Sequence, residues 1–197
     1  MKSIDALVKK ANDLKKKGLK EDEIADDLHL SKATVIWLLT RGVKGGEPPR
    51  DVKIGWRSIG VSGNRISAMA TALTDIILEE TERSGNAPQC VCGVAVNGVP
   101  YATMISDELG CDLAIYRPPA ERGKATGHFS SNYASVKGKK VVFIDDVVST
   151  GDTMRGAIKE VQDQGGTPVL IVVVVNKTGN DDLDGVALRA LIRARTI

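Results

Sequence analysis

Apolar residues recur along this chain with two different spacings. From residue 62 to 83 they return every three or four positions, as at Ile66, Leu73 and Ile77, which predicts one long amphipathic helix. Beyond it, short apolar runs alternate with shorter helical patterns. We expect strands at 90–96, 112–116, 140–144 and 168–175, helices at 101–109 and 153–164, and a short strand within 186–197. This alternation predicts an α/β fold, with a parallel sheet flanked by helices on both faces.

The first 41 residues show only the helical spacing. They predict three helices: one that ends at Gly18, one at 20–28, and one at 32–40 that Ser31 caps and Gly42 closes. The segment "GVKGGEPPR" (42–50) follows, and its glycines and paired prolines indicate a linker with a domain boundary near residue 45. The predicted organisation is a small all-α domain at 1–43, a linker at 44–58 and the α/β domain at 59–197.

The charge of the chain is unevenly distributed. The net charge over 197 residues is only +2, with 42% hydrophobic and 26% charged residues, a composition typical of a soluble globular protein. Residues 1–57 hold 13 Lys/Arg against 9 Asp/Glu, whereas the rest hold 14 against 16. The front end is therefore the candidate for a polyanionic partner, although solvated lysines on a helix would give the same pattern.

Cysteine and hydropathy patterns exclude several classes of protein. Cys90, Cys92 and Cys111 lie in apolar runs, so we expect buried free thiols in a reducing cytoplasm. With two histidines in the chain and no further ligands at zinc-like spacing, a zinc site is not expected. No signal peptide is recognisable, and the longest apolar run, 169–175, is far shorter than the roughly 20 residues of a membrane span.

The stretch "VVFIDDVVSTGDT" (141–153) carries the clearest chemistry. A predicted buried strand ends in Asp145 and Asp146, and a polar loop with Gly151 leads directly into a helix. Ligands of parallel sheets bind beyond the carboxyl ends of the strands, and the N-terminus of a helix favours phosphate. Carboxylates accept hydrogen bonds from sugar hydroxyls or hold Mg²⁺. The stretch thus favours a sugar phosphate, against the plainer interpretation of an Asp N-cap and a polar turn.

This stretch resembles the phosphoribosyl-pyrophosphate (PRPP) signature of type I phosphoribosyltransferases at every position, and residues 59–197 resemble that family, with orotate phosphoribosyltransferases closest. The resemblance implies that Asp145 and Asp146 hold the ribose hydroxyls. The 5-phosphate would be wrapped by Ser149, Thr150, Gly151, Asp152 and Thr153. Pyrophosphate would be bound by Ala95, Val96, Asn97, Gly98 and Arg117. Mg²⁺ would be held through PRPP oxygens rather than by protein side chains alone.

The sequence departs from the family in the long polar segment 117–133. The catalytic loop of orotate phosphoribosyltransferases resembles Arg-Lys-x-x-Lys-x-His-Gly, whereas this chain has "RPPAERGKATG" from Arg117. Pro118, Glu121 and Gly123 stand at the basic positions, which leaves Arg122 and Lys124 as the remaining candidates. Because basic groups neutralise the departing pyrophosphate, the comparison supports PRPP binding better than catalysis.

The stretch "EDEIADDLHLSKATVIWLL" (21–39) fits a helix-turn-helix, with Ile24, Leu28, Leu30, Val35 and Leu38 inward. Its recognition helix would run from Ser31 to Arg41. The residues expected to be exposed toward DNA are Ser31, Lys32, Thr34, Trp37 and Arg41. The alternative is a three-helix subdomain that serves dimerisation or covers an active site.

Taken as a whole, the chain resembles an archaeal family of orotate-phosphoribosyltransferase-like transcription regulators, the GfcR type. That resemblance implies a cytoplasmic, DNA-binding homodimer that senses PRPP or a related phosphorylated metabolite. Two alternatives remain: an active phosphoribosyltransferase acting on orotate or another base, and a plain nucleotide-binding module.

Overall fold

The computed structural model describes residues 4–28, 30–44, 51–119 and 127–195. In chain order the elements are α1 (Ile4–Lys16), α2 (Glu21–Leu28), α3 (Lys32–Lys44), α4 (Arg57–Gly60), α5 (Gly63–Ser84), β1 (Cys90–Val94), α6 (Gly98–Leu109), β2 (Asp112–Arg117), β3 (His128–Phe129), β4 (Lys140–Val148), α7 (Asp152–Asp163), β5 (Thr167–Asn176), β6 (Asp182–Leu183) and β7 (Val186–Arg193). None of the helices within these ranges is long and apolar enough to cross a membrane.

The chain divides into two compact units. The first extends to Trp56 and includes Arg195, and the second spans Arg57–Ala194. Residues 51–56, at the end of the first unit, have no regular secondary structure. The predicted linker residues 45–50 lie outside the described ranges. The helical front end and the α/β part are described separately below.

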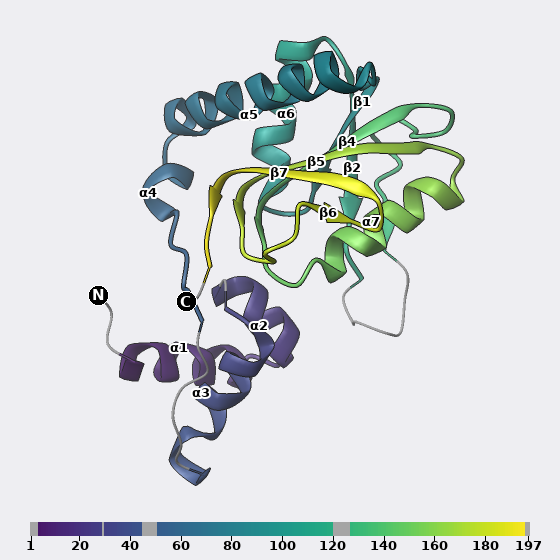
Figure 1. Cartoon of the computed structure of the whole chain (residues 1–197). Helices are drawn as coiled ribbons and strands as arrows, with labels where there is room; N and C mark the ends of the chain where they lie inside the picture. Colours follow the sequence, from purple (N-terminus) through teal and green to yellow (C-terminus); the bar gives the residue numbers. More distant parts are fainter. Residues whose placement is uncertain (1–3, 29, 45–50, 120–126, 196–197) are drawn as a thin grey trace. The chain divides into compact units, whose positions relative to one another are not determined.

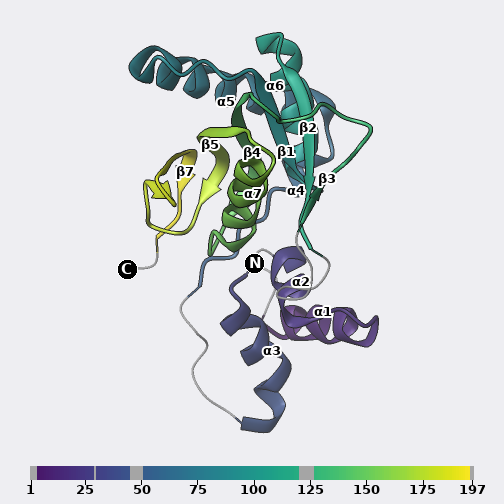
Figure 2. The same cartoon turned by 90° about the vertical axis from the view of Figure 1, so that its right-hand side faces the viewer.

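The second unit is built on a seven-stranded sheet of order β3-β2-β1-β4-β5-β7-β6. Neighbours β2, β1, β4, β5 and β7 are parallel, while β3 and β6 pair antiparallel at the two edges. Helices α5 and α6 contact each other and cover one face, and α7 covers the other (Figures 1 and 2). The predicted parallel sheet with helices on both faces is confirmed.

Alternation along the strands supplies apolar side chains to both faces of this sheet. On the α7 face, Phe143 and Ile171 belong to a cluster that also contains Met154 and Ile158 of the helix. Within β4 the next residues along, Val142 and Ile144, are equally buried and turn to the face that α5 and α6 cover. Because both faces are covered, the central strands consist of near-continuous apolar runs.

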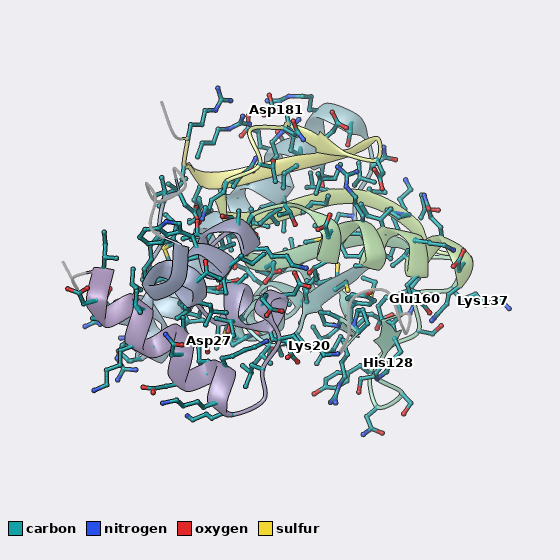
Figure 3. The ribbon with its side chains drawn as sticks, turned by 90° about the horizontal axis from the view of Figure 1, so that it is seen from below. Lys20, Asp27, His128, Lys137, Glu160 and Asp181 are labelled. Carbon is teal, nitrogen blue, oxygen red and sulfur yellow. The ribbon has the colours of Figure 1, made fainter. Side chains whose placement is uncertain are left out.

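The structure revises several predicted boundaries. Strand β4 continues four residues beyond the predicted end at 144, so Asp145 and Asp146 lie within it and not after it. Helix α3 runs past Gly42 to Lys44. The polar segment 117–133 contains β3, whose His128 pairs with Arg117 of β2 and is labelled in Figure 3. A two-residue strand with no apolar pattern of its own gives little signal in the sequence.

Three helices pack around their own core in the first unit. Ala11 of α1, Ile24 and Leu28 of α2, and Val35 and Leu38 of α3 are all nearly inaccessible to solvent. The predicted Ser31 cap is confirmed, since its hydroxyl accepts the Thr34 N–H at 3.2 Å. Gly18 follows α1 with a φ of +93°, as the predicted C-terminal glycine should.

Two of the three cysteines of the α/β unit are buried as expected. Cys90 and Cys92 are buried and Cys111 is half-buried, and all three are free thiols. Burial raises the pKa of Cys90 to about 11 and also raises the pKa values of Cys92 and Cys111. The neutral thiol is therefore favoured in the folded state over the thiolate.

Because of these pKa shifts, the stability of the α/β unit should decrease as pH rises through the alkaline range. A thiol whose pKa is higher in the folded state favours folding below the unfolded pKa of about 8.5, and this contribution is lost as pH rises toward 11. We expect the urea midpoint, followed by circular dichroism, to fall between pH 8 and pH 10.5. Cys90→Ala should show a shallower fall than the parent. Identical pH profiles for the two proteins would contradict the assignment.

Candidate functional site

The two adjacent aspartates point to opposite faces of β4. Asp145 pairs with Val173 of β5, and its carboxylate interacts with Cys92 on the α7 face. Asp146 is only 5% exposed and reaches Asn97, at the start of α6 on the other face. Neighbouring residues of a strand diverge in this way, which separates the two carboxylates and limits their repulsion. The predicted pair is therefore a feature of the strand and not of an exposed loop.

Each carboxylate is fixed by hydrogen bonds. Asp145 Oδ1 accepts the backbone N–H of Asp146 at 2.8 Å, and Asp146 Oδ1 accepts that of Val147 at 2.7 Å. Asp146 Oδ2 accepts Asn97 Nδ2 at 3.1 Å. Burial and the nearby Asp146 carboxylate together raise the pKa of Tyr101, which lies on α6 and is almost fully buried. Tyr101 was not among the predicted site residues. The signal that could have identified it is its position at the start of the predicted helix 101–109, directly after the predicted loop 95–98.

The loop that follows β1 lies directly against β4. Its predicted members Ala95, Val96, Asn97 and Gly98 connect β1 to α6, and the peptide bond between Ala95 and Val96 is cis. A Cβ at Gly98 would stand 2.2 Å from the Ile144 carbonyl oxygen and 3.0 Å from Asp145 Cα. Only glycine permits this approach, which brings the loop and the aspartates together.

The polar turn after β4 begins α7 as predicted. Gly151 precedes the helix with a φ of +88°, and a Cβ there would also lie 3.0 Å from Leu183 of β6. Thr150 Oγ1 donates to Asp152 Oδ2 at 2.9 Å, so the Asp152 carboxylate is already engaged within the turn. The helix N-terminus and the hydroxyls of Ser149 and Thr153 offer N–H and O–H donors that suit a phosphate, whereas the Thr150 hydroxyl already donates within the turn.

Of the basic residues predicted for the ligand site of the α/β unit, Arg117 is the one within the described residues. It is exposed at the carboxyl end of β2, one residue after Tyr116, whose carbonyl accepts the Ala95 N–H at 2.8 Å. Arg117 thus stands at the same edge of the sheet as the loop after β1. Arg122 and Lys124 fall in 120–126, outside the described residues. The first residue described after this gap, Gly127, packs against the Tyr116 hydroxyl, where a Cβ would overlap the ring.

The oxygen chemistry of this edge fits a magnesium ion held mainly by a ligand. The described residues include no group of three or more His, Cys, Asp or Glu side chains able to hold a metal. Asp145 and Asp146 are hard oxygen donors, and three of their oxygens already accept hydrogen bonds. Mg²⁺ commonly takes one or two carboxylates and completes its shell with phosphate oxygens and water. When bound, it would neutralise pyrophosphate charge.

The predicted DNA-facing residues of α3 are not all exposed. Lys32 projects into solvent and pairs with Asp22 of α2 at 2.9 Å. Thr34, expected outside, is only 8% exposed, and half-buried Trp37 packs against the helical core. The side chain of Arg41 lies outside the described set. Among the side chains of α3 that the structure describes, the exposed ones are Lys32, Ala33 and Ile36.

Thr34 is buried because residues 51–56, the connector that follows the linker, begin beside the N-terminus of α3. Asp51 Oδ2 accepts the Ser31 backbone N–H at 2.6 Å and the Thr34 hydroxyl at 2.9 Å. A carboxylate at a helix N-terminus pairs an otherwise free N–H and interacts favourably with the helix dipole. Sequence reasoning missed this residue, because Asp51 lies 20 positions beyond Ser31 and across the linker.

Asp51→Ala should weaken the first unit specifically. We expect its free energy of unfolding to fall by about 1–2 kcal/mol, because a helix cap and a partly buried charged hydrogen bond are lost. Both tryptophans, Trp37 and Trp56, lie in this unit, so their fluorescence in urea reports its unfolding within the full chain. Asp13→Ala, the same change at an exposed position of α1, should move the midpoint little. Equal midpoints for both variants would contradict the capping role.

Comparisons with known proteins show the family of the α/β unit and of the whole chain. The Phosphoribosyl transferase domain family matches residues 62–184. "Transcriptional regulator GfcR" of Thermoplasma acidophilum is 48% identical over 197 residues, covering 100% of this chain and 98% of that protein. The protein of the same name from Picrophilus torridus is 44% identical and covers 98% of each chain.

Solved structures give the same fold. Orotate phosphoribosyltransferase from Aeropyrum pernix superposes with a TM-score of 0.57 at 24% identity, covering 77% of this chain and 83% of that one. The orotate phosphoribosyltransferase of Mycobacterium tuberculosis, solved in complex with PRPP, gives 0.55 at 22% identity, covering 71% and 80%. At these identities the likeness concerns the fold alone.

Proposed function

Because this chain belongs to the phosphoribosyl transferase domain family and, over its whole length, to the GfcR transcriptional regulators, we propose that it is a DNA-binding regulator whose α/β unit binds PRPP or a related phosphorylated metabolite as effector. It would act in the cytoplasm as a homodimer, since helix-turn-helix proteins usually contact two half-sites. The three-helix unit would supply the DNA contacts.

One observation carries the ligand assignment. The loop after β1 and the aspartates of β4 meet through the Asn97–Asp146 hydrogen bond and the close contact at Gly98. The carboxylates and the glycine-containing loop are therefore neighbours, and the donors at the N-terminus of α7 follow β4 directly. A phosphorylated ribose needs hydrogen-bond acceptors for its hydroxyls and anion-binding donors for its phosphate, side by side. This supports PRPP over a ligand that carries only hydroxyls or only phosphate.

A DNA-binding experiment tests the regulator. In gel shifts with the protein's own upstream DNA, Lys32→Ala should weaken binding about fivefold to tenfold and reduce its salt dependence, because one phosphate contact is lost. Lys137→Ala, at an exposed position of the α/β unit labelled in Figure 3, is the matched control and should bind like the parent. PRPP with Mg²⁺ should change the parent's affinity. Absence of any shift at low salt with genomic fragments would refute DNA binding.

The family membership also supports an active phosphoribosyltransferase as a second candidate. The segment from Arg117 argues against it, because Pro118, Glu121 and Gly123 replace the basic residues that neutralise pyrophosphate as it leaves. Purified protein with PRPP, Mg²⁺ and a panel of nucleobases should therefore give no turnover. Robust formation of orotidylate, or of another nucleotide, would establish the enzyme instead.

A further inference from the structure

Among the large apolar side chains of α3 that the structure describes, only Ile36 is exposed. Val35 and Leu38 are 0% and 2% exposed, whereas Ile36 is 45% exposed. Helical spacing places Ile36 on the same face as Lys32, Ala33 and Thr40, three to four residues away on either side. Lys32 and Ala33 are exposed as well, and Thr40 is half-exposed. The outward face of α3 is therefore small and apolar at its centre.

The charge of the first unit is concentrated on and after this helix. Residues 1–28 hold seven Lys/Arg and seven Asp/Glu, while residues 29–56 hold five against two. Ion pairs such as Lys10–Asp27 and Lys15–Glu21 further neutralise α1 and α2, and Asp27 is labelled in Figure 3. Within residues 1–56 the positive surplus thus lies in α3 and in the residues that follow it. A polyanion would be attracted to the part of the unit that carries the outward face of α3.

The major groove of DNA offers one apolar group to such a face. Thymine carries a C5 methyl group there, and no other base has an equivalent. Isolated exposed apolar residues are common on protein surfaces, so exposure alone would mean little. Here the exposed isoleucine has an exposed alanine beside it, on the helix expected to enter the groove, in the segment that carries the positive charge.

We propose that Ile36, with Ala33 beside it, recognises thymine methyl groups, so that the DNA half-site carries A·T pairs where the centre of α3 contacts the groove. The proposal rests on the proposed DNA-binding function and adds a specificity-determining residue to it. It also replaces Thr34 and Trp37 as the base-reading candidates, because Thr34 is buried beneath Asp51 and Trp37 packs into the core.

Replacing thymine by deoxyuridine removes the methyl group and keeps phosphates and hydrogen-bonding edges. The parent protein should bind uracil-substituted DNA about threefold to tenfold more weakly than the thymine form, the range expected for losing one or two buried methyl contacts. Ile36→Ala should bind thymine DNA with a similar loss and should be nearly insensitive to the substitution. Ile36→Val should keep most of the sensitivity, and Lys32→Ala should keep all of it while binding more weakly overall.

The outcomes separate the proposal from the function beneath it. No gel shift with thymine DNA would refute both. Equal affinity of the parent protein for thymine and uracil DNA would contradict the thymine contact but not DNA binding. The same holds if Ile36→Ala loses as much affinity on uracil substitution as the parent does. Loss of dimer mass for Ile36→Ala in sedimentation without DNA would show that this face joins two copies, and would equally overturn it. An unchanged Trp fluorescence midpoint in urea would establish that the variant folds.

Discussion

Gly98→Ala is expected to lower the free energy of unfolding of the α/β unit by about 3 kcal/mol or more. The new Cβ would stand 2.2 Å from the Ile144 carbonyl oxygen and 3.0 Å from Asp145 Cα, both of them main-chain atoms of the central strand β4. Main chain in the middle of a packed sheet has no cheap way to move, so the loop 95–98 must lift away. The loss should appear as a lower denaturation midpoint in circular dichroism.

The same change should also impair ligand binding. A lifted loop separates Asn97 from Asp146, so calorimetric affinity for PRPP with Mg²⁺ should fall more than tenfold. Gly63→Ala is the matched control, because no atom lies within 4 Å of a Cβ there and Gly63 begins α5. We expect that control to change stability by less than about 0.5 kcal/mol. A Gly98→Ala protein as stable as the parent would mean that the close contact is not maintained in solution.

Asp146→Asn is expected to weaken PRPP binding tenfold to a hundredfold. The ribose diol would lose a charged hydrogen-bond acceptor, which contributes roughly 1.5–3 kcal/mol of binding free energy. Asparagine is the appropriate change because Asp146 is buried and accepts from both Val147 N and Asn97 Nδ2. Alanine would leave those donors without their acceptor. With asparagine, the carbonyl can stay on Val147 N, and the Asn97 amide can turn to accept from the new amide.

A fold control keeps this second prediction decisive. The urea midpoint of Asp146→Asn should stay within about 1 kcal/mol of the parent's stability, since shape and one acceptor are preserved. Asp163→Asn, at the exposed end of α7, should bind PRPP like the parent. Unchanged calorimetric affinity for Asp146→Asn, with the fold intact, would remove Asp146 from the proposed site.

The sequence predicts those features of the fold and of the site that are set by residues close together in the chain. The short apolar runs and the period-3.6 patterns predicted the strands, the helices and the parallel sheet, because burial on two faces or on one face requires these spacings of apolar residues. The aspartates and the turn at 149–153 follow from the strand and the helix that border them, since ligands of parallel sheets bind beyond the strand ends. The loop 95–98 was implied by the family resemblance. Strand ends and the two-residue β3 were missed, because pairing with a neighbour extends or creates strands that local pattern does not mark.

The corrections on α3 have the same physical origin. Helical periodicity could place Ile36 outside, one position after buried Val35, but it could not show that Thr34 is buried. That burial depends on Asp51, which returns from beyond the linker to the helix N-terminus. No local rule connects two residues 17 positions apart.

The sequence by itself determined the class of fold, the separate helical front end and the chemistry of the stretch 141–153. These are properties of spacing and residue type, and spacing alone sets which face of a helix or strand is apolar. Tertiary structure alone decided that Asp145 and Asp146 diverge across β4, that Asn97 holds Asp146, and that Asp51 closes the start of α3. Those contacts join segments far apart in the chain, so they exist only once strands and helices have packed.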